Sequence, residues 1–89
     1  TSWSQKHDFL EGTKSHVLNL GKEEQEMVIE VVTEEGSVDI TAKDKNGEII
    51  TEITDAETGT YNFSAEGKVK FRIYCEEHKG SVSVRKADS

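Results

Sequence analysis

The sequence predicts an all-β fold, an antiparallel two-sheet β-sandwich (jelly-roll or Ig-like) of about seven or eight short strands. Apolar and polar residues alternate with a period of two, and glycine-containing turns separate the alternating runs. No segment longer than one turn shows the spacing of an amphipathic helix. The chain has 89 residues, of which 33% are apolar and 33% charged. We therefore expect residues 1–89 to form a single domain with a thin core.

The N-terminal region predicts two strands, residues 7–10 and 15–20, joined by a hairpin at Gly12. Residues 23–26 are expected to form a solvated loop. Residues 27–33 are apolar on both faces over part of their length. This pattern is typical of a central strand covered on one side by the second sheet and on the other by a loop or terminus.

The region after Gly36 shows the clearest alternation. Asn46-Gly47 predicts a type I′ hairpin between residues 37–43 and 49–54. Further strands are expected at residues 61–65, 69–75 and 82–85. In residues 69–75 the odd positions, including Phe71 and Cys75, are expected in the core. Trp3 is expected to close an open end of that core.

Three motifs between Gly36 and Lys86 carry a resemblance to known modules. They are Ser37-Val38-Asp39-Ile40 leading through Lys45-Asn46-Gly47-Glu48, then Thr58-Gly59-Thr60-Tyr61-Asn62-Phe63, and finally His78-Lys79-Gly80-Ser81-Val82. This stretch resembles the small β-sandwich modules of secreted proteins and lipoproteins from Gram-positive bacteria. The resemblance implies a domain without catalysis that is extracellular or anchored at the cell surface. Thr1 is not an initiator Met, so we expect a chain processed or cut from a longer one, although no lipobox Cys lies near Thr1.

The charge balance excludes two classes of partner. Eleven Lys and Arg against 18 Asp and Glu give a net charge of -7, whereas nucleic acids and anionic membranes attract basic surfaces. No apolar run reaches the roughly 18 residues of a membrane helix, so no direct membrane insertion is expected.

One basic strip stands out in this acidic chain. Lys68, Lys70, Arg72 and Tyr74 alternate with the core positions of their strand and so share its outer face. Lys70, Arg72 and Tyr74 are our candidate ligand-binding residues, since Arg and Tyr are enriched where proteins grip partners. The alternative is that these side chains pair with Glu residues of a neighbouring strand.

Cys75-Glu76-Glu77-His78 has the spacing of a C-x-x-H metal pair. Residues three apart on a strand point to opposite faces, so only a bend at His78 brings both to one ion. We therefore expect Cys75 to be a core residue. We expect no metal site and no cofactor. His7 and His16 could add ligands to Cys75 and His78, but nothing in the sequence requires it. Asp44, Asn46 and Glu48 faintly match a calcium loop, but the hairpin explains them without an ion.

The expected function is that of a non-catalytic extracellular or cell-surface module, acting as a spacer or adhesion domain or binding a protein or glycan. No nucleophile motif or carboxylate pair indicates an enzyme. The alternative is a small metal-binding sensor or chaperone domain that uses Cys75 and His78. A lone Cys75 forms no internal disulfide, so cysteine content leaves the compartment open.

Overall fold

The computed structural model describes residues 2–87; residues 1 and 88–89 lie outside the described part. Five strands make up the fold: β1 (Trp3–Asn19), β2 (Gln25–Lys43), β3 (Ile49–Ile53), β4 (Gly59–Ala65) and β5 (Lys68–Lys86). They form one antiparallel sheet in the order β1-β5-β2-β3, and β4 pairs with β2. The all-β antiparallel prediction is confirmed. Residues 2–87 contain no helix long and apolar enough to cross a membrane.

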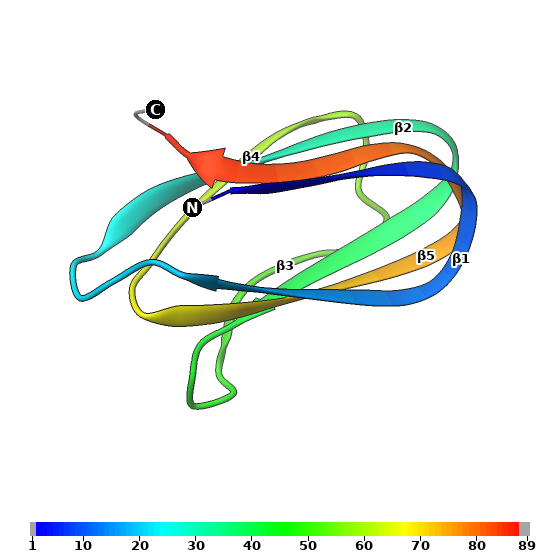
Figure 1. Cartoon of the computed structure of the whole chain (residues 1–89). Coiled ribbons are helices and arrows are strands. Elements are labelled where there is room, and N and C mark those ends of the chain that lie inside the picture. The colour runs from blue at the N-terminus through cyan, green and yellow to red at the C-terminus, as the bar shows by residue number, and fades with distance from the viewer. Residues whose placement is uncertain (1, 88–89) are drawn as a thin grey trace.

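The three long strands, β1, β2 and β5, bend together at one end, and the sheet folds back on itself (Figure 1). We call the part that contains residues 3–7, 25–33, 59–65 and 80–86 the first half-sheet. The second half-sheet contains residues 12–19, 37–43, 49–53 and 68–75. The rings of Trp3 and His16 stack with centroids 4.2 Å apart. Fully extended, the same strand would hold these two residues roughly 40 Å apart, so the half-sheets face each other.

The predicted count of seven or eight short strands is wrong. Gly12, Gly36 and Gly80, which we expected to sit in hairpin turns, lie where the long strands bend. At each bend the register shifts or the backbone kinks, yet the strand continues along the same neighbour. The hairpin expected at Gly12 is therefore absent, because residues 7–10 and 15–20 pair with β5 rather than with each other.

Glycine is required at two of these bends by close backbone approach. A Cβ on Gly36 would overlap the carbonyl oxygen of Glu77, and one on Gly80 would overlap that of Val32. Both glycines have positive φ, 75° and 148°. Strands β2 and β5 thus touch backbone to backbone at the fold.

The core lies between the two half-sheets and follows the predicted alternation. Phe71, fully buried in β5, packs edge to face against Trp3 at 5.5 Å and Phe63 at 5.8 Å between centroids. Trp3 is half-buried and packs against this cluster; that it closes an open end of the core stays a prediction. The other members of the core cluster include Met27, Ile29, Val31, Val38, Ile40, Ala42, Val69, Ile73, Cys75, Val82 and Val84.

The hairpin at Asn46-Gly47 is confirmed, with β2 pairing β3 from Ile40 opposite Ile53. The predicted type I′ turn is wrong, because that turn needs positive φ at both central residues and only Gly47, at 84°, has it. Asp44 stabilises this turn: its Oδ1 accepts hydrogen bonds from the backbone N–H groups of Asn46 and Glu48, at 2.8 and 3.0 Å. One oxygen of the Asp44 carboxylate thus satisfies two backbone N–H groups of the turn.

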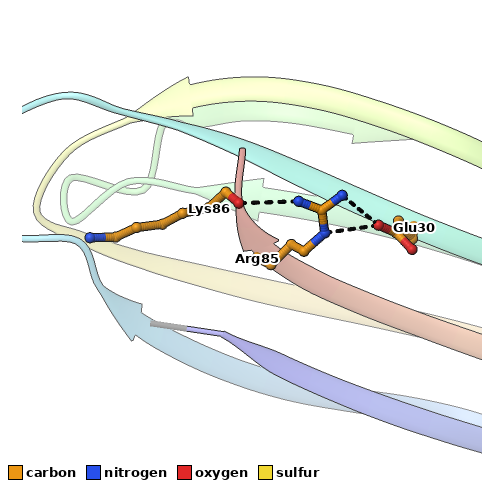
Figure 2. Close-up of polar contacts among 3 residues, drawn as sticks. All are labelled: Glu30, Arg85 and Lys86. Atoms are coloured by element: carbon orange, nitrogen blue, oxygen red, sulfur yellow. Dashed lines mark hydrogen bonds and ion pairs between the residues drawn. The ribbon is translucent and has the colours of Figure 1, made fainter. Parts of the chain in front are cut away.

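Residues 27–33 form a central strand, as predicted, since this part of β2 pairs with β4 on one side and β5 on the other. Its outer face carries Val28, Glu30 and Val32. Val28 is only 7% exposed and lies opposite Arg85 in the register. The Arg85 guanidinium donates to Glu30 and to the Lys86 carbonyl across this face (Figure 2).

Candidate functional site

Three metal-ligating side chains meet inside the bend of the sheet. His7 comes from β1, and Cys75 and His78 come from β5. Their donor atoms all lie within 4.8 Å of one another. The Nδ1 atoms of the two histidines are 2.6 Å apart, and the Cys75 Sγ is 3.8 Å from the His7 Nδ1. All three residues are buried, with exposures of 2% for His7, 1% for Cys75 and 0% for His78.

The expectation that Cys75 and His78 point to opposite faces of their strand is wrong. Glu77 has a φ of 46°, which interrupts the extended backbone of β5. Glu76 and Glu77 are both exposed, whereas Cys75 and His78 on either side of them are both buried. The extra outward residue is a β-bulge, which puts two residues three apart on the same face. The bend at His78 that such a pair requires is present.

A sequence signal for this bulge exists. Two consecutive charged residues, Glu76-Glu77, interrupt a strand whose inward and outward positions otherwise alternate strictly. One polar residue too many in such a run is the pattern that a bulge leaves. The sequence carries no comparable signal for His7, because its place in the cluster depends on the register between β1 and β5.

The outer nitrogens of both imidazoles have hydrogen-bond partners. The His7 Nε2 lies 2.8 Å from the Gln5 Oε1, and the His78 Nε2 lies 3.0 Å from the Thr33 Oγ1. The Thr33 hydroxyl donates its own hydrogen to the Ala56 carbonyl at 3.0 Å, so it accepts from His78. If the Gln5 oxygen accepts from His7, both Nε2 atoms carry the hydrogen. The lone pairs of both Nδ1 atoms then point into the cluster.

Burial keeps the cluster uncharged. Desolvation lowers the pKa of His7, with a further contribution from the nearby His78, and desolvation also lowers the pKa of His78. Burial raises the pKa of the Cys75 thiol; Asp39 adds to this rise and Lys14 opposes it. At neutral pH the three groups are therefore two neutral imidazoles and a thiol. A thiol with a raised pKa is a poor nucleophile, which disfavours covalent catalysis.

Two hollows in the surface flank the bend. One, of about 790 Å³, is lined by His7 together with Val32, Lys79 and Gly80 among others. The other, of about 520 Å³, is lined by Cys75 and by Gly12 and Gly36. Each hollow thus reaches one member of the buried cluster from a different side.

His16, the other histidine considered as a ligand, lies elsewhere. Its ring stacks on the Trp3 indole with an interplanar angle of 13°, in the core beside Phe71. It does not belong to the group formed by His7, Cys75 and His78.

The basic strip lies on the outer face of the second half-sheet. Lys68, Lys70, Arg72 and Tyr74 are all exposed on β5, and Tyr74 is 44% exposed. The Tyr74 hydroxyl donates to a Glu76 carboxylate oxygen at 3.1 Å, and this carboxylate raises the pKa of Tyr74. The structure brings the three candidate residues into one row; ligand binding by them remains a prediction.

The register shows which residues flank the strip. Lys70 lies between Val17 on β1 and Lys43 on β2. Arg72 lies between Ser15 and Thr41. Neither cation therefore has a carboxylate directly opposite. Within residues 2–87 the one ion pair is Arg85 with Glu30, on the other half-sheet (Figure 2).

The chain matches no protein-family model, and no curated protein matches it.

Proposed function

We propose that this chain is a non-catalytic binding module of the extracellular or cell-surface type. Its two facing half-sheets serve as the two sheets of a β-sandwich in the jelly-roll or Ig-like sense. The resemblance of residues 36–86 to secreted modules of Gram-positive bacteria supports this location and role. The ligand-binding residues are Lys70, Arg72 and Tyr74, and the partner is an acidic protein surface or an anionic glycan.

The observation that carries the proposal is the set of neighbours around the basic strip. Lys70 faces Lys43, and like charges directly opposite each other destabilise a sheet. Arg72 faces only hydroxyl side chains. In residues 2–87 of this chain, whose net charge is -7, Lys70 and Arg72 thus form no ion pair. This favours a binding role over pairing with Glu on a neighbouring strand.

The two cations of the strip match a negatively charged, extended partner, whereas Tyr74 lies opposite Asp39 and bonds to Glu76, so its ring offers stacking rather than attraction of charge. Successive outward residues on a strand are roughly 7 Å apart, so Lys70, Arg72 and Tyr74 present two cations and an aromatic ring in line. The Tyr74 ring offers a flat apolar surface and the Arg72 guanidinium offers paired donors for carboxylate or sulfate groups. Such contacts weaken with salt, because exposed charges are screened beyond about 8 Å at physiological ionic strength.

The test compares the wild type with the double variant Arg72→Ala/Tyr74→Ala. Retention is measured on immobilised heparin, an anionic polysaccharide, and on neutral dextran, at low and at physiological salt. We expect salt-sensitive retention of the wild type on heparin, weaker retention of the double variant and no retention on dextran. Both side chains are exposed, so the double variant should keep its fold, to within about 1 kcal/mol.

Lys45→Ala is the matched control, because Lys45 is an exposed cation in the hairpin turn, away from the strip. It should retain most of the wild-type binding. If the folded double variant binds heparin as the wild type does, the strip is not the binding surface. A wild type that binds neither polysaccharide overturns the anionic-glycan partner, and equal loss in Lys45→Ala reduces the effect to net charge.

A further inference from the structure

We infer that His7, Cys75 and His78 form a binding site for one copper(I) ion, held by two imidazole nitrogens and one thiolate. This inference rests on the bend of the sheet and is independent of the proposed role of the basic strip.

The first argument is the direction of the lone pairs. Gln5 and Thr33 hold the outer N–H groups of the two imidazoles, so both Nδ1 lone pairs face inward at 2.6 Å. Two acceptors at that distance repel each other, so the pair either opens around a cation or shares a hydrogen in an N–H···N bond. Metal-bound histidines commonly donate their other N–H to an oxygen that fixes the ring, as both histidines do here.

The second argument is the spacing of the donors. A trigonal ion with metal–sulfur and metal–nitrogen bonds of about 2.3 and 2.0 Å holds sulfur and nitrogen roughly 3.7 Å apart. The Cys75 Sγ lies 3.8 Å from the His7 Nδ1, which fits this geometry. The same ion holds two nitrogens roughly 3.5 Å apart, so the histidine pair must open by about 1 Å. The ion would have to move the two rings apart by that amount against their hydrogen bonds to Gln5 and Thr33.

The third argument is coordination number and charge. Structural zinc sites almost always have four ligands, and the described residues bring three donors together. Thiolate and imidazole ligands suit copper, and copper takes trigonal His₂Cys sites. One thiolate with Cu⁺ is neutral, whereas one thiolate with Zn²⁺ leaves a net positive charge. An unpaired charge in a site exposed by 2% or less is costly, so the monovalent ion is favoured.

Binding has a simple proton balance. Cu⁺ displaces the proton of the Cys75 thiol, which leaves to solvent, and the copper–sulfur bond forms without any change of oxidation state. The two surface hollows that reach His7 and Cys75 give the ion a path through side-chain motion at the bend.

In one other arrangement, a hydrogen bond between the Nδ1 atoms of His7 and His78 takes the place of the metal. If the Gln5 amide is turned so that its NH₂ donates to the His7 Nε2, then the His7 Nδ1–H donates to the His78 Nδ1. The cluster is then a closed hydrogen-bond network with no role for an ion. Gln5→Glu separates the two arrangements, since a carboxylate accepts from His7 but cannot donate to it.

The experiment titrates the reduced protein anaerobically with Cu⁺ in competition with the chromophoric chelator bicinchoninate. We expect one ion per chain, ultraviolet thiolate-to-copper absorption, and X-ray absorption fitted by two nitrogens and one sulfur. Zn²⁺ titrated in parallel should bind at least about 100-fold more weakly. No copper binding in the folded wild type, a copper shell without sulfur, or tighter binding of Zn²⁺ would each overturn the inference.

Variants test each part of the site while circular dichroism monitors folding. Cys75→Ser should abolish the absorption band, and Thr33→Val, which removes the partner of the His78 Nε2, should weaken copper binding by about 10–100-fold. Gln5→Glu should bind copper about as tightly as the wild type; a large gain in affinity there would favour the proton arrangement in the wild type, and loss of binding would overturn the inference. His16→Gln is the matched control, since this histidine lies outside the cluster, and its copper affinity should be unchanged.

Discussion

Strand β5 carries both candidate sites, and they differ in how the strand presents them. From Lys68 to Tyr74 the strand alternates regularly, so the basic strip lies outside and the core residues lie inside. From Cys75 to Gly80 the alternation is broken by a bulge at Glu77, and two residues three apart both face inward. Regular alternation yields a flat exposed surface, whereas its interruption yields a buried convergence of side chains from two strands.

The difference shows where chemical specificity arises in so small a domain. A flat strip on a twisted sheet offers charge and one aromatic ring, which select a class of partner. A bend brings donors from β1 and β5 within 4.8 Å of one another and excludes water from them. Bulges recur beside functional sites for this reason, since they redirect side chains that the regular pleat would separate.

The largest effect is expected from Gly80→Ala, which breaks the bend itself. The new Cβ would overlap the Val32 carbonyl, a backbone atom that cannot move without separating β2 from β5. We expect a loss of unfolding free energy above about 4 kcal/mol, or failure to fold, as measured by urea denaturation. Gly47→Ala is the matched control: its φ of 84° is also positive, but nothing lies within 4 Å of the added Cβ. It should cost only about 1–2 kcal/mol, and equal losses in the two variants would mean that the close approach at the bend is not required.

The next largest effect concerns the regular part of β5. Phe71 is fully buried between the two half-sheets, so Phe71→Ala should cost about 3–5 kcal/mol. Val17→Ala changes a residue exposed on the outer face of the same half-sheet and should cost under about 0.5 kcal/mol. A loss below about 1 kcal/mol for Phe71→Ala would reverse the face assignment and put Lys70, Arg72 and Tyr74 inside.

The buried histidines predict a pH dependence confined to the bend. Burial lowers the pKa of His7 and of His78, so the unfolded chain binds protons that the folded chain excludes. In the presence of a metal chelator, the contribution of these groups to stability is complete above about pH 6.5 and declines as the pH falls below it. The slope is at most about 1.4 kcal/mol per pH unit for each histidine. The variant His7→Gln/His78→Gln should lose this slope, and an unchanged slope would assign the pH dependence to other groups.

The smallest effect is expected at the Arg85–Glu30 ion pair on the first half-sheet. Both side chains are substantially exposed, at 42% and 46%, so solvent screens their attraction. Glu30→Gln should change the unfolding free energy by less than about 1 kcal/mol. A larger loss in denaturation experiments would show that the pair holds the cover over Val28.

Much of the fold was predictable from local patterns. The period-two alternation identified the faces of residues 37–43 and 69–75, and Asn46-Gly47 identified the one tight hairpin. Other glycine positions were misread, because a glycine at a bend and a glycine in a turn look the same in a sequence. Gly36 and Gly80 are needed for contacts with distant backbone atoms, and only the folded sheet defines those contacts.

The two candidate sites also differ in how far local sequence patterns predict them. The basic strip follows from parity alone, so the sequence placed Lys70, Arg72 and Tyr74 together on one exposed face. The cluster at the bend combines a local feature, the Glu76-Glu77 bulge, with a long-range register that sets His7 opposite Gly80. No local pattern contains that register.

The central claim is that the sheet folds back at the bulges so that His7 and His78 meet. The most direct measurement is a two-dimensional nuclear Overhauser spectrum of the ring protons. It should contain cross-peaks between His7 and His78, whose ring centroids are 4.8 Å apart, and between Trp3 and His16, at 4.2 Å. A spectrum with the Trp3–His16 peak but without the His7–His78 peak would show a folded sheet whose alternation is unbroken at Glu77, which contradicts the account.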